Sequence, residues 1–555
     1  MKKFLSKVFA TVIGLTVALG GVGCINFDPD TGTSEDPPIN TSVDTDRTQL
    51  NVGVYDGGLG MNWTRAVADA FEEKYADVEF EEGKKGVQVM IYGKGEKANY
   101  EPGVLIPNIQ NKIETNDVYL TANSDLKQFV NAGICEDLTD LLEKDVYGED
   151  GNLADDLSGI DSLANGIDDY LDGINGTNSL LDRMDDYFVD AYQWKDENYY
   201  AFPFEDSTFG IVYDADLFEK RKWEVPETME QFYTLLDKMK NSNITPFTWT
   251  GVNNFYFTPI TTAIVAQYEG IEGANQNLFY NGTFNGTPIT DENAYLLAGQ
   301  QGKLEALKFF RKITSDTRYY SNMAFGSSQG HLDAQAEFLL SVERASNGAG
   351  NRIAMILEGE WWENEARGTF NEMASSDESM GYGKRNFRFM PMPYIEGQKS
   401  DKRIIVSFTN GSVGFVNKNS KNKDLAKLWV LFMHQNSSLA TFTTHTGAVL
   451  PYEYELTKEQ YDSLTPFAQS VWDVRHDEDV QIYRTMKTGD FAAYGDIKMG
   501  GAGREIVMND SVTNALRGFY DNPKLTAEEY FENSKKYYEE KWPANYQKYK
   551  EQQKT

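Results

Sequence analysis

Apolar residues recur along this chain in two alternating rhythms. Short apolar runs, such as those at 50–55 and 87–92, are typical of strands. The first run ends in glycines and leads into a segment in which Val67, Ala70 and Phe71 share one helical face. A strand pattern that alternates with a helix pattern predicts a parallel sheet covered on both faces, and therefore an α/β fold.

The alternation continues and is interrupted once. Helix patterns at 104–113 and 126–142 flank a strand pattern at 116–125. The interruption, at 147–190, is acidic and punctuated by Gly and Asn, and we interpret it as helices inserted on the surface of the first lobe, with a solvated charged face. Pro203 then stands between aromatic strand segments and marks a change of unit.

Amphipathic helix patterns dominate the second half of the chain. They occur at 225–240, 302–314 and 331–345, and Thr228 is a suitable N-cap for the first of them. A strand, a turn and a helix follow within 411–435, and the C-terminal part is rich in Tyr, Lys and Glu and is predicted to be helical.

The segment "AMILEGEWWENEAR" places two adjacent tryptophans where a buried strand stops. Gly359 lets the chain turn, and Glu363 and Glu365 then fall in a first helical turn, where carboxylates complement the helix dipole. Neighbouring residues on a helix point about 100° apart, so Trp361 and Trp362 cannot face one ligand equally well. We predict one ring in a binding site and one in the core.

Length and charge narrow the class of protein. At 555 residues the chain is too long for one ordinary core, and two or more domains are expected. Lys and Arg number 52 against 85 Asp and Glu, which gives a net charge of −33. Nucleic-acid binding depends on cations that neutralise phosphates, so we expect no nucleic-acid partner.

The N-terminus has the pattern of a secretory signal. Lys2, Lys3 and Lys7 precede an apolar stretch that is too short to span a membrane comfortably, and small residues lead up to Cys24. The tetrapeptide that ends at this cysteine is similar to a bacterial lipobox, although leucine is usual where its first glycine stands. We therefore predict a signal peptide at 1–23 and lipidation, with palmitate, at Cys24; the alternative is an ordinary signal with an incidental cysteine.

The residues after the signal favour an exported protein held at the membrane. The segment 24–48 is rich in Asp, Pro, Thr and Ser and is predicted to be a disordered tether. Cys135 is the only other cysteine, so no disulfide framework is expected if Cys24 carries lipid, and Cys135 is predicted to be a small buried hydrophobe. We expect the protein at the extracytoplasmic face of the cell membrane.

Four segments, in this order, carry a family resemblance. They are "DVYLTANSDLKQFVNAGICEDLTDLL" at 117–142, "YYAFPFEDSTFGIVYDADLFEK" at 199–220, "AMILEGEWW" at 354–362, and "GSVGFVNKNSKNKDLAKLWVLFM" at 411–433 with "THTGAVLP" at 444–451. Together they resemble the extracellular solute-binding proteins of carbohydrate ABC transporters, in the branch typified by maltose-binding protein. The family usually has Tyr-Asn-Lys-Asp-Leu in the second segment, where this chain has Tyr-Asp-Ala-Asp-Leu.

This resemblance implies a two-lobed periplasmic-binding-protein-like fold of type II, with the ligand in a cleft between lobes joined by hinge crossings. The expected lobes are 49–203 with 386–455 (N-terminal) and 204–385 with 456–555 (C-terminal). Pro203 and the prolines of Met390–Pro393 mark the expected crossings. The resemblance also implies capture of an oligosaccharide, delivery to ABC transporter permease subunits, no cofactor and a monomer.

Candidate ligand contacts follow from the chemistry of sugars. Flat rings stack on the C–H face of a pyranose, and polar groups bridge its hydroxyls. The candidates are Asn62, Trp63, Ser124, Asp125, Asp206, Thr208, Tyr213, Trp249, Phe255, Glu360, Trp361, Trp362, His445 and Thr446. Packing explains Trp63 and Tyr213 at least as well, and helix capping explains Ser124 and Asp125 equally well. Trp361 is our candidate stacking platform.

Two other classes of function stay open. A secreted glycosidase needs two carboxylates a few ångströms apart, and Glu358 and Glu360 would project to the same side if their strand persists. The chain has no His-Glu-x-x-His motif and no phosphate loop, and His331, His434 and His476 have no partners at metal-ligand spacing. The other alternative is a surface glycan adhesion module that never feeds a transporter.

Overall fold

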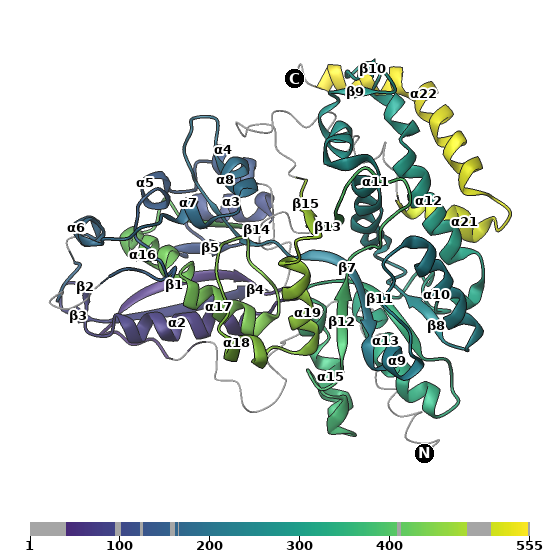
Figure 1. The fold of residues 1–555 in the computed structure, drawn as a ribbon. Coiled ribbons are helices and arrows are strands. Elements are labelled where there is room, and N and C mark those ends of the chain that lie inside the picture. The colour runs from purple at the N-terminus through teal and green to yellow at the C-terminus, as the bar shows by residue number, and fades with distance from the viewer. Residues whose placement is uncertain are drawn as a thin grey trace. The chain divides into compact units, whose positions relative to one another are not determined.

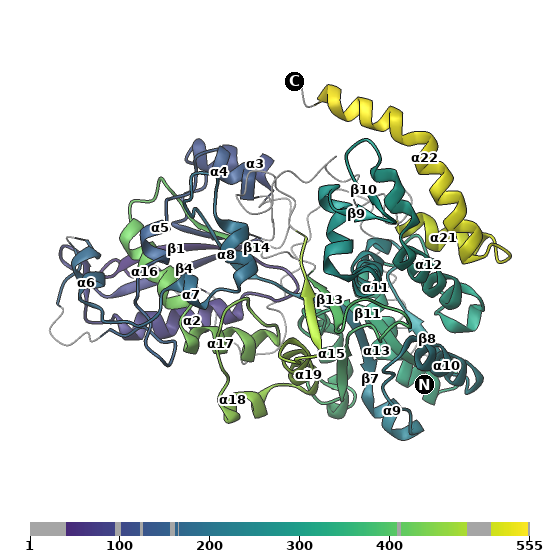
Figure 2. The same ribbon diagram turned by 45° about the horizontal axis from the view of Figure 1, so that its top comes forward.

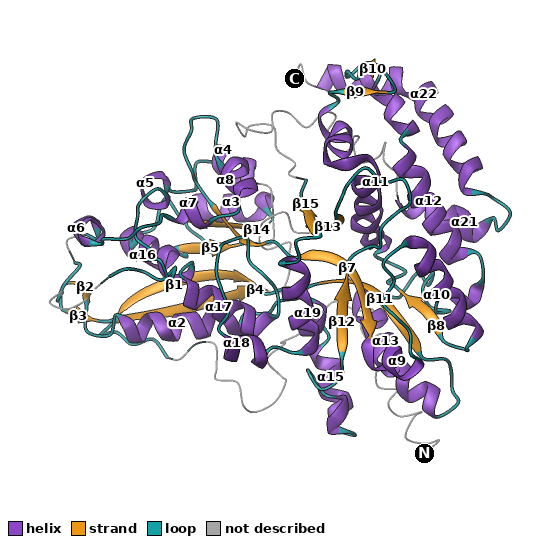
Figure 3. Cartoon of the chain, viewed as in Figure 1, coloured by secondary structure: helices purple, strands orange, loops and turns teal. Residues whose placement is uncertain are grey.

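The computed structural model describes residues 40, 42–94, 101–121, 126–155, 161–164, 166–407, 412–485 and 512–552. The signal at 1–23 and the lipidation candidate Cys24 lie outside the described residues, as do Ser124 and Asp125. The described chain forms two α/β lobes, each built on its own sheet and flanked by helices (Figure 1, Figure 3). The predicted fold class is thus confirmed.

The first sheet has five strands in the order β4-β1-β5-β14-β6. β1 (Thr48–Tyr55) pairs in parallel with β4 (Val87–Lys94) and β5 (Val118–Leu120). β14 (Ser412–Val416) runs antiparallel to β5 and to β6 (Phe202–Glu205). The apolar positions that alternate along the first half of β1 are buried, as a period of two requires.

Helices cover both faces of this sheet. α2 (Asn62–Lys74) and α17 (Asn436–Thr446) lie on one side of it, and α3 (Pro102–Gln110) and α4 (Leu126–Asn131) lie on the other (Figure 1, Figure 2). The predicted apolar face of α2 is confirmed at Val67 and Phe71. Ala70 is exposed, and Ala68 is buried in its place.

The second sheet follows the order β15-β13-β7-β11-β8, with a further strand, β12, paired to β7. Its strands are β7 (Thr208–Asp214), β8 (Thr245–Thr248), β11 (Ile353–Gly359), β12 (Phe387–Met390), β13 (Arg403–Ser407) and β15 (Val480–Tyr483). β8 is parallel to β11, and β7 is antiparallel to β11, β12 and β13.

Neighbouring residues of β7 belong to two different apolar clusters. Ile211 packs with the side chains of α11 (Phe257–Phe279), whereas Val212 packs with those of α13 (His331–Ser346). Successive side chains of a strand point to opposite faces, so this sheet is covered by helices on both sides.

The chain crosses between the sheets three times, the last time after β14, since β15 pairs with β13 in the second sheet. It leaves the first sheet at Glu205 and enters the second at Thr208. It returns between Ser407 and Ser412, later than predicted. The predicted boundary at 386 assigned β12 and β13 to the N-terminal lobe. Both strands pair instead with β7 in the second sheet, along the edge of β7 that faces away from β11. The other lobe boundaries stay predictions.

The remaining elements connect or cover the sheets. They are β2 (Glu79–Glu81), β3 (Lys84–Lys85), α5 (Thr139–Leu142), α6 (Asp168–Gly173), α7 (Leu180–Arg183), α8 (Asp186–Tyr192), α9 (Ala215–Arg221), α10 (Met229–Asn241), η3 (Asn254–Tyr256), β9 (Thr283–Phe284), β10 (Thr287–Pro288), η4 (Ala294–Gly299), α12 (Gln301–Thr314), η5 (Thr317–Tyr319), α14 (Trp362–Glu365), α15 (Arg367–Ala374), η6 (Glu378–Met380), α16 (Lys423–Met433), α18 (Lys458–Ser463), α19 (Pro466–Arg475), α21 (Val512–Asp521) and α22 (Ala527–Gln552). α10 begins with the predicted cap, since the Thr228 hydroxyl accepts from the Gln231 backbone N–H.

Two sequence expectations need correction. The helix predicted at 126–142 is broken, because Gly133 adopts a positive φ of 65° that ends α4. Cys135 lies after that break, buried as predicted. The insert at 147–190 forms only short helices, and many of its apolar side chains join the core of the first lobe instead of lying on the surface.

The predicted tether is also shorter than 24–48. The Asn40 side chain accepts from the Ile91 N–H at 2.8 Å and donates to the Ile91 carbonyl at 2.6 Å. Arg47 forms an ion pair with Glu72 at 2.9 Å. The end of the segment is therefore held along β4, where its polar groups satisfy an exposed strand edge.

The C-terminal helices belong to the second lobe. α21 and α22 pack along α12, and α22 also contacts η4 (Figure 2). No helix within the described ranges is both long and apolar enough to cross a membrane.

Candidate functional site

The ends of several strands meet at the first two crossings. β1 ends at Tyr55 and β6 at Glu205 in the first sheet. In the second sheet, the parallel strands β8 and β11 end at Thr248 and Gly359, and the antiparallel β7 begins beside them at Thr208. Ligands of open α/β sheets bind beyond the carboxyl ends of the strands, so this junction is the place to look for a site.

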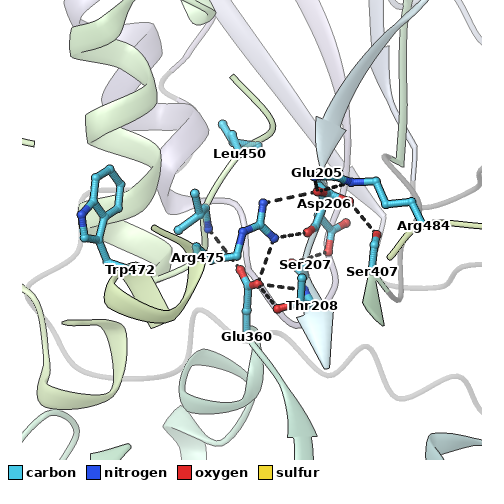
Figure 4. Close-up of polar contacts among 12 residues, drawn as sticks. Glu205, Asp206, Ser207, Thr208, Glu360, Ser407, Leu450, Trp472, Arg475 and Arg484 are labelled. Carbon is cyan, nitrogen blue, oxygen red and sulfur yellow. Dashed lines mark hydrogen bonds and ion pairs between the residues drawn. The ribbon is translucent and has the colours of Figure 1, made fainter. Parts of the chain in front are cut away.

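A buried ionic network occupies the first crossing (Figure 4). One carboxylate oxygen of Asp206 accepts from Arg484 Nη2 at 2.7 Å and from Arg475 Nη2 at 3.3 Å. The other oxygen accepts from the Ser407 hydroxyl, at the start of the second crossing. We call Asp206, Glu360, Arg475 and Arg484 the hinge network. It connects the first two crossings to α19, through Arg475, and to the residue after β15, Arg484.

Glu360 is the second carboxylate of the hinge network. Its Oε1 accepts from the Thr208 backbone N–H at 2.8 Å and from Arg475 Nη1 at 3.1 Å. Its Oε2 accepts from the Val449 N–H at 3.2 Å, in the segment after α17. Both oxygens of this fully buried side chain are therefore used by the protein itself.

Burial and the neighbouring charges act in opposite directions on the pKa values of the hinge network. Burial acts to raise the pKa of Asp206, but Arg484 and Arg475 outweigh it, and the pKa falls below its usual value. Burial raises the pKa of Glu360, which Arg475 only partly opposes. Burial acts to lower the pKa of Arg484, but Asp206 and Asp185 leave it raised. The charges at Asp206 are thus stabilised in place.

This arrangement bears on three predicted ligand contacts. Asp206, Thr208 and Glu360 lie together at the junction, as their positions predict, but their polar groups bond to one another and to the arginines. The proposed pairing of Glu358 with Glu360 fails, because β11 ends at Gly359 and the two carboxylates enter different clusters. The ligand roles of the three residues stay predictions.

Four aromatic rings form a continuous row beside the hinge network. Ring centroids are 5.2 Å apart between Phe255 and Tyr256, 5.3 Å between Tyr256 and Phe209, and 6.1 Å between Phe209 and Trp361. Phe255 is 51% exposed, whereas the other three rings are buried. We call these four residues the aromatic row; it leads from the surface to the end of β11.

The tryptophan doublet is divided between the two apolar clusters of the second sheet. Trp361 packs on the α11 side, and Trp362 packs on the α13 side. The ring of Trp361 lies so close to Gly58 and Gly359 that a Cβ at either glycine would come within 3 Å of it. Gly359 is thus needed for the room it leaves, and it has no positive φ. The two rings thus lie in different clusters and both are buried, and the placement of one ring in a binding site stays a prediction.

A pair of carboxylates lies close enough to Tyr256 of the aromatic row to act on its hydroxyl. Gln335 Nε2 donates to Glu358 Oε1 at 3.1 Å and to Glu365 Oε2 at 2.6 Å. His331 Nε2 lies 3.5 Å from Glu365 Oε1. Glu358 is buried, while the Glu365 side chain keeps 18% of its surface exposed. We call Glu358 and Glu365 the acid pair.

The electrostatics of the acid pair reach both lobes. Burial, and then the charge of Glu365, raise the pKa of Glu358 well above its usual value. Burial, followed by Glu205 and Glu365, raises the pKa of Tyr55 to about 12. Burial, followed by Glu358 and Glu365, also raises the pKa of Tyr256. Side chains at the ends of β1, β6 and β11 therefore face a shared polar region.

Three predicted aromatic contacts pack into the cores. Trp63 is buried and meets Phe442 edge-on, with ring centroids 5.0 Å apart. Trp249 is buried beneath the loop after β8. Tyr213 lies at the far end of β7 and packs on Phe218 at 4.7 Å, away from the junction. Their local packing accounts for these rings.

Three polar candidates, Asn62, His445 and Thr446, lie at helix ends. His445 is exposed, and its Nδ1 lies 2.8 Å from the Thr441 carbonyl of its own helix. The backbone carbonyl of Thr446 accepts from Asn364, which links α17 to α14. Asn62 begins α2 and is half-buried.

Several residues at the junction were not predicted as ligand contacts. Tyr55 and Glu205 end strands, so their position was a usable signal. Glu365 has a helix-start pattern that dipole compensation already explains, and Gln335 and Tyr256 carry no local pattern that links them to β11. Within the described residues, no group of three or more His, Cys, Asp or Glu side chains could hold a metal ion.

The protein thus has two α/β lobes joined by crossings, and polar and aromatic side chains gather where the strands of both sheets end. A family model described as bacterial extracellular solute-binding protein matches residues 66–461. The chain therefore belongs to this family. No curated protein matches the sequence.

Solved structures agree with this fold. The chain is similar to a protein solved in work on xylan utilisation by the thermophilic bacterium Caldanaerobius polysaccharolyticus, with 17% identity over 88% of this chain and 99% of that one and a TM-score of 0.55. It is also similar to a chitin oligosaccharide binding protein (16%, 90% and 100%, TM-score 0.54) and to the solute-binding protein RafE in complex with raffinose (14%, 86% and 100%, TM-score 0.50). At these identities the likeness shows the fold alone.

Proposed function

We propose that this chain is the lipid-anchored substrate-binding subunit of an ABC transporter, which captures an oligosaccharide outside the cell and delivers it to the permease subunits. The observation that carries the proposal is the aromatic row, which runs from the exposed ring of Phe255 to Trp361 and includes Tyr256, on which the charges of the acid pair act. Rings and carboxylates in one place are the groups that stack on and hydrogen-bond a sugar.

Family membership supports the transport role, and the named ligands of similar structures support the cargo. Chitin oligosaccharide and raffinose are carbohydrates named for two proteins with this fold, and a third was solved in work on the utilisation of xylan. The two lobes joined by crossings suit a closure in which a ligand shifts the population toward the form that binds it better.

A glycosidase is the alternative from another class, and the contacts favour it less. Glycosidases need two carboxyl groups that flank one bond of the substrate, but in the acid pair Glu358 is buried and only Glu365 keeps exposed surface. Residues 326–330, Gly-Ser-Ser-Gln-Gly, match the Gly-x-Ser-x-Gly motif that holds the nucleophile of α/β-hydrolases. Ser328, however, is exposed in a loop before α13 and does not lie on a strand-to-helix turn, as that nucleophile does.

A calorimetric panel of oligosaccharides, with chromatography of the same mixtures, tests the proposed function. We expect saturable binding of at least one sugar and no change in the sugar recovered. Release of shorter products would instead identify a glycan-active enzyme. A panel in which no sugar binds would remove the carbohydrate proposal.

The tryptophan doublet provides a matched pair of variants for this assay. Trp362→Ala opens a cavity among Phe338, Phe370, Phe387 and Phe467, and we expect it to lower the free energy of unfolding by about 3–5 kcal/mol. Trp361→Ala is expected to weaken sugar binding more than Trp362→Ala does, measured on folded protein by calorimetry. Weaker binding by Trp362→Ala alone would reverse the assignment of the two rings.

The membrane anchor is tested separately. Mass spectrometry of the protein from membranes should find an acylated N-terminal Cys24, with the first 23 residues removed. A free N-terminus at any residue after Cys24 would contradict the lipid anchor while leaving the sugar-binding proposal intact.

A further inference from the structure

The acid pair lacks an ion pair with Lys or Arg in the part of the chain that the structure describes. Among those described residues, the only cationic candidate is His331, which is charged only when protonated. The hinge network, a few residues away along the chain, pairs its carboxylates with Arg475 and Arg484. A positive charge is therefore missing from one cluster and present in the other.

A second observation is an acceptor with no donor. Gln335 is fully buried, and its amide nitrogen bridges the two carboxylates. Its amide oxygen is also buried and accepts no hydrogen bond from any residue that the structure describes. Such groups are uncommon in folded proteins and need an explanation, and a donor from a ligand supplies one. Three acceptors thus stand together, on Glu358, Glu365 and Gln335.

The surrounding rings suit the same kind of ligand. Tyr256 lies within the field of both carboxylates, and Phe255 beside it is exposed. An ammonium group carries three N–H donors, and it is attracted both to carboxylates and to aromatic faces. A hydroxyl supplies one donor and no charge, so it does not offset a negative charge on Glu365.

We propose that the sugar this protein captures carries a protonated amine, and that Glu365 receives it. Glu365 is the member of the acid pair with exposed surface, so it makes the direct contact, while Glu358 and Gln335 behind it offer further acceptors. This inference rests on the proposed function and narrows its cargo to amino sugars. Sugars that carry a carboxylate or phosphate would be repelled from the same place.

Matched ligands test the inference. Calorimetry compares glucosamine with glucose, galactosamine with galactose, and short β-1,4-linked oligomers of glucosamine with those of N-acetylglucosamine and of glucose. We expect at least one amine to bind about tenfold or more tightly than its neutral counterpart. The preference should shrink as salt is raised from about 0.05 to about 0.5 M, because screening weakens an ionic contact and leaves a neutral one.

Two nearby glutamates of the same short helix supply the variants. Glu365→Gln should reduce the amine preference to less than about threefold, since the amide keeps the shape and loses the charge. Glu363→Gln is the matched control: this carboxyl is buried against Thr465, away from the acid pair, and its loss should leave the preference unchanged. Circular dichroism of both variants checks that they are folded, and the salt series tests the ionic contact on the unmodified protein, without any variant.

The outcomes separate the inference from the proposed function. Neutral sugars that bind as tightly as their amines, or an amine preference that survives Glu365→Gln, would overturn the inference and leave sugar capture standing. If no sugar in the broader panel binds, the proposed function fails and the amine inference fails with it.

Discussion

The hinge network and the acid pair are two clusters of carboxylates at one end of the same sheet, and they are built oppositely. Asp206 and Glu360 are matched by Arg475 and Arg484, and their oxygens are used within the protein. Glu358 and Glu365 share one amide and form no ion pair with an arginine of the described chain. Matched buried charges hold a structure together, whereas unmatched ones are kept at a stability penalty and mark candidate binding sites.

The largest expected effect breaks the matched cluster. Asp206→Ala would leave Arg475 and Arg484 buried without their shared carboxylate, and we expect the free energy of unfolding to fall by about 3–5 kcal/mol. Urea unfolding followed by tryptophan fluorescence measures it. A loss below about 1 kcal/mol would mean that the network does not hold the crossing.

The free energy of unfolding should also depend on pH through Glu205, the residue before Asp206, and in the opposite direction to its dependence on Asp206. Burial raises the pKa of Glu205 from 4.5 to about 7, so the folded state binds a proton more tightly than the unfolded state does. Its contribution is fully present below pH 4.5 and is lost as pH rises through about 7. Glu205→Gln should therefore flatten the stability profile between these values and add up to roughly 3 kcal/mol at about pH 8.

The sign is reversed for Asp206, whose pKa is lowered from 3.8 by the two arginines against the effect of burial. Its contribution is present above pH 3.8 and is lost as pH falls through the lower folded value. Two adjacent carboxyl groups with opposite slopes would be visible in urea unfolding from about pH 3 to about pH 8. Equal slopes in Glu205→Gln and the unmodified protein would contradict the raised pKa of Glu205.

The smallest expected effect concerns the outer side of the same network. Arg484 also contacts Asp185, at 3.2 Å, but the Asp185 side chain is 36% exposed. Water screens such a pair, so Asp185→Asn should change the free energy of unfolding by no more than about 1 kcal/mol, while keeping the cap of α8. A change as large as that of Asp206→Ala would show that burial does not decide the strength of these pairs.

The sequence predicted the two-lobed fold and most elements because strand and helix periodicities are local. It predicted the first crossing near Pro203 for the same reason, since β6 ends shortly after that proline. The second crossing was misplaced, because the pairing of β12 and β13 with β7 depends on strands far away in the chain. The break at Gly133 was missed because a glycine in a helix pattern does not always adopt a positive φ.

The candidate site was predicted less completely than the fold. The separation of Trp361 and Trp362 into different clusters follows from helix geometry and was predictable, whereas the ligand role of Trp361 stays a prediction. Asp206 and Glu360 were placed correctly at strand ends, but their saturation by Arg475 and Arg484 was not, because α19 and β15 lie more than a hundred residues further along the chain. Long-range partners decide which carboxylate is structural and which is available.

The most direct test of the proposed binding site is hydrogen–deuterium exchange with and without a saturating sugar, chosen as the tightest binder of the calorimetric panel. A ligand held between the lobes should slow exchange in both, at residues 55–59 of the first lobe and at 253–256 and 361–366 of the second. Protection confined to one lobe, or found only away from these segments, would contradict the claim that the aromatic row and the acid pair form the binding site.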